Sequence, residues 1–142
     1  MKKTLLSLLA ATLLFTGSAT VLSANQANKF EKPFLIQGKL PHLTMMVKML
    51  WNDTDLALTK AQKEKLLVVR KDTLTAVKSL KTKIMKLENE VVTESNNGTK
   101  PASLKNMVKK IASLRVEATM VHLKCIYNTR KILSKDQLDI LE

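Results

Sequence analysis

The sequence predicts an all-α protein: a short helix, a long antiparallel helical hairpin and a short C-terminal helix. Aromatic residues make up 4% of the 142-residue chain, which has three Gly and three Pro. This composition disfavours a β-sandwich, which needs many turns and aromatic strands. Apolar residues recur at spacings of three and four over two long stretches, as on one face of a helix. A turn at 93–102 separates the stretches, so we expect them to pair as a hairpin.

The first residues have the pattern of a signal peptide. Met1 and the basic Lys2 and Lys3 precede the apolar run Leu5–Phe15, which is shorter than the roughly 20 residues of a membrane-spanning helix. We expect the signal peptide to cover 1–24, with cleavage after Ser23 or Ala19 as alternatives. Its removal leaves 118 residues and, because two lysines are lost, lowers the net charge from +12 to +10. The sequence therefore predicts a soluble protein in the bacterial periplasm that does not span the membrane.

Residues 25–41 are expected to form an extended or mobile arm. Pro33, Gly38 and Pro41 interrupt this segment, and no helical period is sustained through it. The side chains of its apolar part could dock on a partner or on the body of the domain, with a partly disordered tail as the alternative. These side chains are Phe30, Phe34, Leu35 and Ile36. The helical domain is then expected to cover 42–142.

A short first helix is predicted from about His42 to Trp51, because apolar residues share one helical face there. That face carries Leu43, Met46, Val47 and Leu50. Beside it lie Met45 and Met49, which with Trp51 make a flexible apolar surface of the kind that promiscuous binders use. Ordinary core packing is the alternative for these three side chains.

The long helix is predicted from residue 59 to about 92, with strongly basic flanks, and its antiparallel mate begins after a cap at Ser103. The apolar stripe of the long helix consists of Leu66, Val69, Thr73, Ala76, Leu80, Ile84, Leu87 and Val91. The stripe of its mate consists of Met107, Ile111, Leu114, Ala118, Val121 and Cys125. Because Cys125 lies on this stripe, we expect a small buried hydrophobe rather than a ligand or crosslink.

Two short motifs mark helix starts about 75 residues apart. The first contains Leu58, Thr59 and Gln62, and the second contains Leu133, Ser134 and Gln137. In each, the hydroxyl can accept from the backbone amide three residues on, while the Gln side chain reaches back to the amide of the cap. The Leu before each cap can pack one turn ahead, on Leu138 in the second motif and on the stem of Lys63 in the first.

With the signal peptide and the long hairpin, these motifs resemble the Spy/CpxP family of periplasmic proteins, which is known by a repeated L-T-x-x-Q motif. The resemblance covers the chain after about Pro41. The second motif departs from the pattern because Ser134 replaces Thr, although Ser caps a helix at least as well. The resemblance implies a thin, curved homodimer and ATP-independent protection of unfolded or aggregation-prone proteins. Some members of the family damp an envelope-stress sensor kinase, and related ones bind metal.

Composition and motifs disfavour an enzyme, because the chain has two His and no G-x-x-x-x-G-K run. A basic exported protein is expected to meet unfolded proteins, acidic surfaces, anionic lipid or envelope polymers, and not nucleic acid. A merely solvated basic face is the alternative. We therefore predict a chaperone for unfolded or misfolded periplasmic proteins. Its client-binding candidates are Met45, Met46, Met49, Trp51, Arg70 and Lys78.

This prediction requires no cofactor, but two alternatives stay open. One is a metal sensor or scavenger for copper or zinc, with imidazole and sulfur ligands from His42, His122 and Cys125. His122 and Cys125 are three residues apart and share a helical face. Further sulfur ligands would come from Met45, Met46, Met49 or Met120. The other alternative is a repressor that docks on the periplasmic domain of a sensor kinase.

Overall fold

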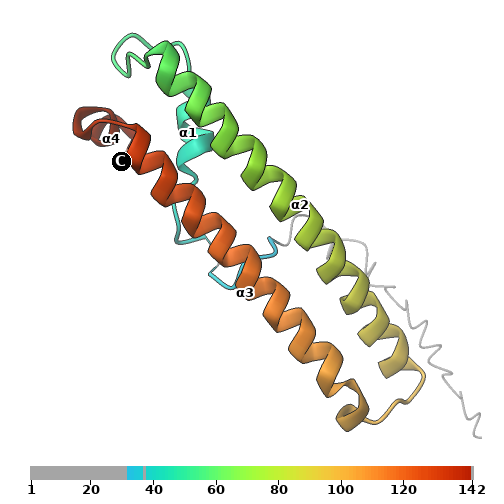
Figure 1. Ribbon diagram of the computed structural model, residues 1–142. Coiled ribbons are helices and arrows are strands. Elements are labelled where there is room, and N and C mark those ends of the chain that lie inside the picture. The colour runs from blue at the N-terminus through green and yellow to red at the C-terminus, as the bar shows by residue number, and fades with distance from the viewer. Residues whose placement is uncertain (1–31, 37, 142) are drawn as a thin grey trace, which may run out of the picture. The chain divides into compact units, whose positions relative to one another are not determined.

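A computed structural model describes residues 32–36 and 38–141 of the chain. The described residues form four helices: α1 (Leu43–Met49), α2 (Lys60–Asn96), α3 (Pro101–Ile132) and α4 (Lys135–Leu141). The two long helices, α2 and α3, run antiparallel as a hairpin, and α1 and α4 lie where α2 begins and α3 ends (Figure 1). The predicted all-α architecture is confirmed. The predicted signal peptide and the first part of the arm lie outside the described residues.

The turn of the hairpin is shorter than the sequence pattern predicted. Helix α2 continues to Asn96, and the chain reverses at Gly98, where φ is +78°. A positive φ is readily adopted by Gly alone, so the helix ends where this residue allows the reversal. Helix α3 begins at Pro101, and Ser103 lies inside its first turn instead of capping it. Proline suits this first position because its φ is already helical and it has no amide that needs a partner.

The hairpin is held together by a core between its two helices. Leu80 and Ile84 of α2 are buried against Leu114 and Ala118 of α3, all on the stripes that the spacing predicted. Phe34 completes this core from outside the hairpin. The arm is anchored beside it, because the backbone amide of Leu35 donates a 2.9 Å hydrogen bond to Thr119 Oγ1. The part of the arm around Phe34 therefore packs on the body of the domain.

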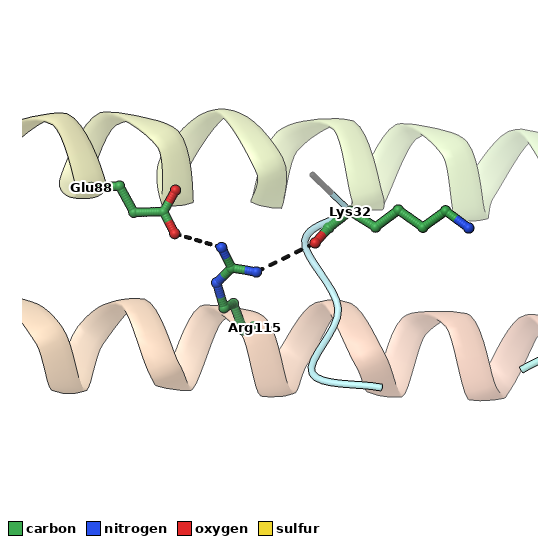
Figure 2. Close-up of polar contacts among 3 residues, drawn as sticks. All are labelled: Lys32, Glu88 and Arg115. Atoms are coloured by element: carbon green, nitrogen blue, oxygen red, sulfur yellow. Dashed lines mark hydrogen bonds and ion pairs between the residues drawn. The ribbon is translucent and has the colours of Figure 1, made fainter. Parts of the chain in front are cut away.

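One arginine joins the arm to both helices (Figure 2). Arg115 Nη2 on α3 donates a 2.6 Å hydrogen bond to Glu88 Oε1 on α2, and its Nη1 donates to the carbonyl oxygen of Lys32 at 3.3 Å. The Arg115 and Glu88 side chains are both partly shielded from water. A shielded, charge-assisted pair is stronger than an exposed one. Arg115 thus fixes the arm at the middle of the hairpin.

A second core lies where the helix ends meet. It contains Val47, Leu56, Leu66, Leu133 and Leu141, and it is extended by Met46, Leu50, Trp51, Leu58, Ile132 and Leu138. Leu133 and Leu138 belong to the same cluster, as expected if they pack across the start of α4. Every helix end in this region therefore contributes to one apolar cluster.

Both predicted capping boxes are formed. Thr59 Oγ1 accepts from the amide of Gln62 at 3.2 Å, and Gln62 Oε1 accepts from the amide of Thr59 at 3.0 Å. The same two bonds occur between Ser134 and Gln137, at 3.2 and 3.0 Å. Each box satisfies two backbone amides that a helix start leaves without partners.

The two boxes are also bonded to each other, which the motifs did not predict. Gln62 Nε2 donates to Gln137 Oε1 at 2.8 Å and to the carbonyl of Ile132 at 2.9 Å. In return, Gln137 Nε2 donates to Gln62 Oε1 at 3.2 Å and to the carbonyl of Leu56 at 2.9 Å. Each side-chain amide thereby uses its full set of donors and acceptors. The pair links the starts of α2 and α4 to the end of α3.

We expect Gln137→Ala to destabilise the fold more than Ser134→Ala. Losing the Ser134 hydroxyl removes one cap, which costs about 0.5–2 kcal/mol. Losing the Gln137 amide also leaves the Leu56 carbonyl without its partner, at about 1–3 kcal/mol for a buried group, and removes the two hydrogen bonds to Gln62. Denaturation with urea, followed by circular dichroism, measures both, with the exposed Lys135→Ala as control. Equal losses for the two variants would contradict the cross-link.

Candidate functional site

The predicted client-binding methionines divide into two environments. Met45 and Met49 project from α1 with 56% and 77% of their surfaces exposed. Met46 and Trp51 are half-buried and pack against the second core. The core-packing alternative therefore holds for Trp51, which lies in the turn after α1, while Met45 and Met49 are exposed to water. Met46 lies on the core face of α1, as its spacing predicted.

A groove lies between α1 and the first part of α2. Its volume is about 370 Å³. The described residues that line it are Thr44, Val47, Lys48, Trp51, Leu66, Leu67 and Arg70. Apolar side chains dominate this set, with cations from both helices. The groove brings together two predicted client-binding residues, Trp51 and Arg70, which lie in different elements.

An exposed apolar stripe runs along α2, and the sequence analysis did not recognise it. Leu67, Leu74, Met85 and Val92 are each about half exposed. They are seven, eleven and seven residues apart, and these intervals bring a helix back to nearly the same face. Arg70 and the exposed Lys78 lie between the apolar members of this face. The sequence signal was a second apolar period on α2, about a third of a turn away from the core stripe.

The two histidines of the chain meet between the arm, α1 and α3. The His42 and His122 rings stack with centroids 4.7 Å apart and planes 17° apart. Phe34 stacks on His122 as well, at 4.8 Å. Lys32 Nζ lies 3.0 Å from His42 Nε2. Because an ammonium can only donate, that imidazole nitrogen must accept, which makes His42 neutral here.

These histidines and Cys125 are close together, but they are not arranged as metal ligands. Ligand lone pairs of imidazole lie in the ring plane, so two nearly parallel stacked rings cannot both direct them at one ion about 2.0–2.1 Å away. Cys125 is buried, and its sulfur lies 3.8 Å from Thr44 Oγ1. Among the described residues, no group of three or more His, Cys, Asp or Glu is placed to hold a metal ion.

Both imidazoles are pushed towards their neutral forms. For His122, burial lowers the pKa most, the charge of His42 and that of Lys32 lower it further, and a backbone hydrogen bond to Pro41 acts in the opposite direction. For His42, burial and then the charge of Lys32 lower the pKa. His122 Nδ1 is buried and has no hydrogen-bond partner among the described residues. A proton added here would be poorly solvated and close to other cations.

Comparison with known proteins gives no match to this chain among family models, curated proteins or solved structures. The resemblance to the Spy/CpxP family therefore stays a prediction, based on the two motifs and the order of the helices. In the part of the chain that the structure describes, no helix is both long and apolar enough to cross a membrane.

Acid is expected to destabilise the protein through the stacked histidines. Folding lowers the pKa of each histidine below the ordinary value of 6.5. Between the lowered pKa of the folded state and 6.5, the unfolded chain therefore binds protons more readily than the folded one. The stability that neutral imidazoles confer is fully present above about pH 6.5 and is lost as the pH falls through that window.

The measurement is the fall in Tm between about pH 7.5 and pH 5, compared with that of a His42→Phe, His122→Phe variant, which keeps aromatic stacking without titrating. The wild type should lose more. Because carboxylates contribute equally to both proteins, an equal fall in the two would contradict a role for the histidines.

Proposed function

We propose that the protein is a periplasmic chaperone that binds unfolded or aggregation-prone proteins without ATP. The observation that carries the proposal is the α2 stripe. Leu67, Leu74, Met85 and Val92 are exposed along one face of a helix. On a protein with a net charge of +12, or +10 after removal of the predicted signal peptide, the same face also presents Arg70 and Lys78. Such a surface can attract chains by charge and then hold them by adaptable apolar contacts.

The mixture of charge and apolar surface explains why binding would be broad and reversible. Exposed charges attract acidic segments over about 10 Å at 0.1 M salt, whatever the sequence around them. Isolated leucine and methionine side chains then contribute modest contacts, and methionine adapts to many partner shapes. Met45 and Met49 extend this surface onto α1. The arrangement of His42, His122 and Cys125 does not favour the copper or zinc alternative.

The proposed homodimer is supported by an apolar stripe on the other long helix. Val116, Met120 and Tyr127 of α3 are each about half exposed. They are four and seven residues apart, so they share one helical face. A thin hairpin buries little surface by itself, and a second copy on this face would supply the missing core. The α2 stripe would stay available for clients.

Charge reversal on the α2 stripe should weaken protection without unfolding the helix. The assay follows aggregation of a chemically denatured client, diluted without nucleotide into buffer that contains stoichiometric protein. Arg70→Glu with Lys78→Glu should protect several-fold less, while stability should change little, because Lys78 is exposed and Arg70 is half-exposed. The matched control, Lys109→Glu with Lys110→Glu on α3, changes the net charge equally at exposed positions.

Added salt should weaken protection by the wild-type protein, because salt screens the attraction between exposed charges.

The Ser134→Ala variant should still protect clients at temperatures below its own, lowered Tm, because the Ser134 cap is structural. Failure of the wild type to suppress aggregation would contradict the chaperone function. It would favour instead a protein that docks on a single partner, such as a sensor kinase domain.

The dimer proposal predicts that Met120→Glu with Tyr127→Glu makes the protein monomeric at micromolar concentration. Burying two carboxylates against an apolar partner surface is costly, and we expect the dimer Kd to rise by at least about tenfold. Sedimentation velocity measures the oligomeric state. Val108→Glu, at a half-exposed α3 position off the stripe, is the control. A monomeric wild type, or a variant that dimerises normally, would contradict the proposed interface.

A further inference from the structure

The groove between α1 and α2 has a length that fits a short stretch of polypeptide. One wall consists of Thr44, Val47 and Lys48 of α1 and of Trp51, which lies in the turn just after this helix. The seven residues of α1 correspond to about 10 Å. The opposite wall is one turn of α2, from Leu66 to Arg70. The groove is therefore about as long as three residues of extended chain, at about 3.3 Å each.

Cations stand at both ends of this groove. Lys63 Nζ lies 5.7 Å from the centroid of the Trp51 ring at one end. Arg70 is seven residues further along α2, about 10 Å away by helix rise. Lys48 adds a third cation on the α1 wall, and none of the described lining residues is acidic. The apolar part of the groove therefore lies between two cations, Lys63 at one end and Arg70 at the other.

We infer that the groove binds client segments in which about three large apolar residues are flanked on both sides by Asp or Glu. The inference rests on the proposed chaperone function and names the substrate class of one part of its surface. The apolar residues would lie on Leu67 and Trp51, over a floor formed by the buried Val47 and Leu66. The flanking carboxylates would pair with Lys63 and Arg70, where Arg can form two parallel hydrogen bonds. An anionic acyl chain carries its charge at one end and would leave one of these cations unused.

Trp51 provides a direct reporter, because it is the single tryptophan of the chain and it lines the groove. The probe is a synthetic peptide with a Leu-Ile-Leu core between pairs of Glu. It should change Trp51 fluorescence saturably. Two matched peptides should bind at least about tenfold more weakly. One has Lys in place of Glu and lacks the charge complementarity, and the other has a Ser-Ser-Ser core and lacks the apolar contacts.

Two pairs of neighbouring variants test the geometry. Arg70→Glu should weaken binding of the Glu-flanked peptide by about tenfold or more, as expected for a lost charge-assisted contact. Lys71→Glu, one residue away and outside the groove lining, should weaken it far less. Leu67→Ser should weaken binding, while Val68→Ser should not, although these neighbours are 56% and 58% exposed. Equal effects within either pair would overturn the inference.

The outcomes separate the inference from the function on which it rests. If client aggregation is suppressed but the Glu-flanked peptide leaves Trp51 unchanged, the groove assignment is wrong and the chaperone function stands. If neither occurs, the proposed function itself fails. Saturable quenching by dodecanoate without a response to the peptide would assign the groove to an acyl anion instead. A Trp51 change that depends on protein concentration alone would assign it to a second copy of the chain.

Discussion

The paired amides of Gln62 and Gln137 are the interaction on which the arrangement of the helix ends depends. Each amide completes its own capping box and donates to the other, and between them they also bind the carbonyls of Leu56 and Ile132. Two stretches of the chain about 75 residues apart, 56–62 and 132–137, are thereby held together by side-chain atoms whose hydrogen-bonding capacity is filled. In a thin hairpin with little core, such a network fixes geometry that apolar packing alone would leave loosely specified. The second core of leucines forms around this network.

Stability and the proposed binding are assigned to different faces of α2. The buried face, which includes Leu80 and Ile84, packs against α3 and Phe34. The exposed stripe lies about a third of a turn away. On this proposed binding surface the apolar side chains are separated by cations and do not form one continuous patch. Substitutions on the stripe can therefore change binding while the hairpin stays folded.

Local features were predictable from the sequence, whereas contacts between distant segments were not. Capping boxes, helix periods and core stripes depend on residues within one or two turns, so Thr59, Ser134 and the Leu114 stripe were identified correctly. The predicted end of α2, before a turn at 93–102, is too early, because the helix continues to Asn96 and the chain reverses only where Gly98 permits it. The docking of Phe34 and the stack of His42 on His122 join segments about 80 residues apart. No local pattern encodes such pairings, although both histidines had been singled out.

Helix α1 connects the histidine stack to the groove. Seven residues are too few for a helix that is stable in isolation, so the position of α1 is set by its tertiary contacts. His42 at its N-terminus stacks on His122, the buried Leu43 and Val47 anchor it to the body, and Thr44 contacts Cys125 on α3. Thr44 and Val47 also line the groove. The α1 wall of the groove, where we propose that a client segment binds, is therefore held in place by contacts that include the stack of two neutral imidazoles.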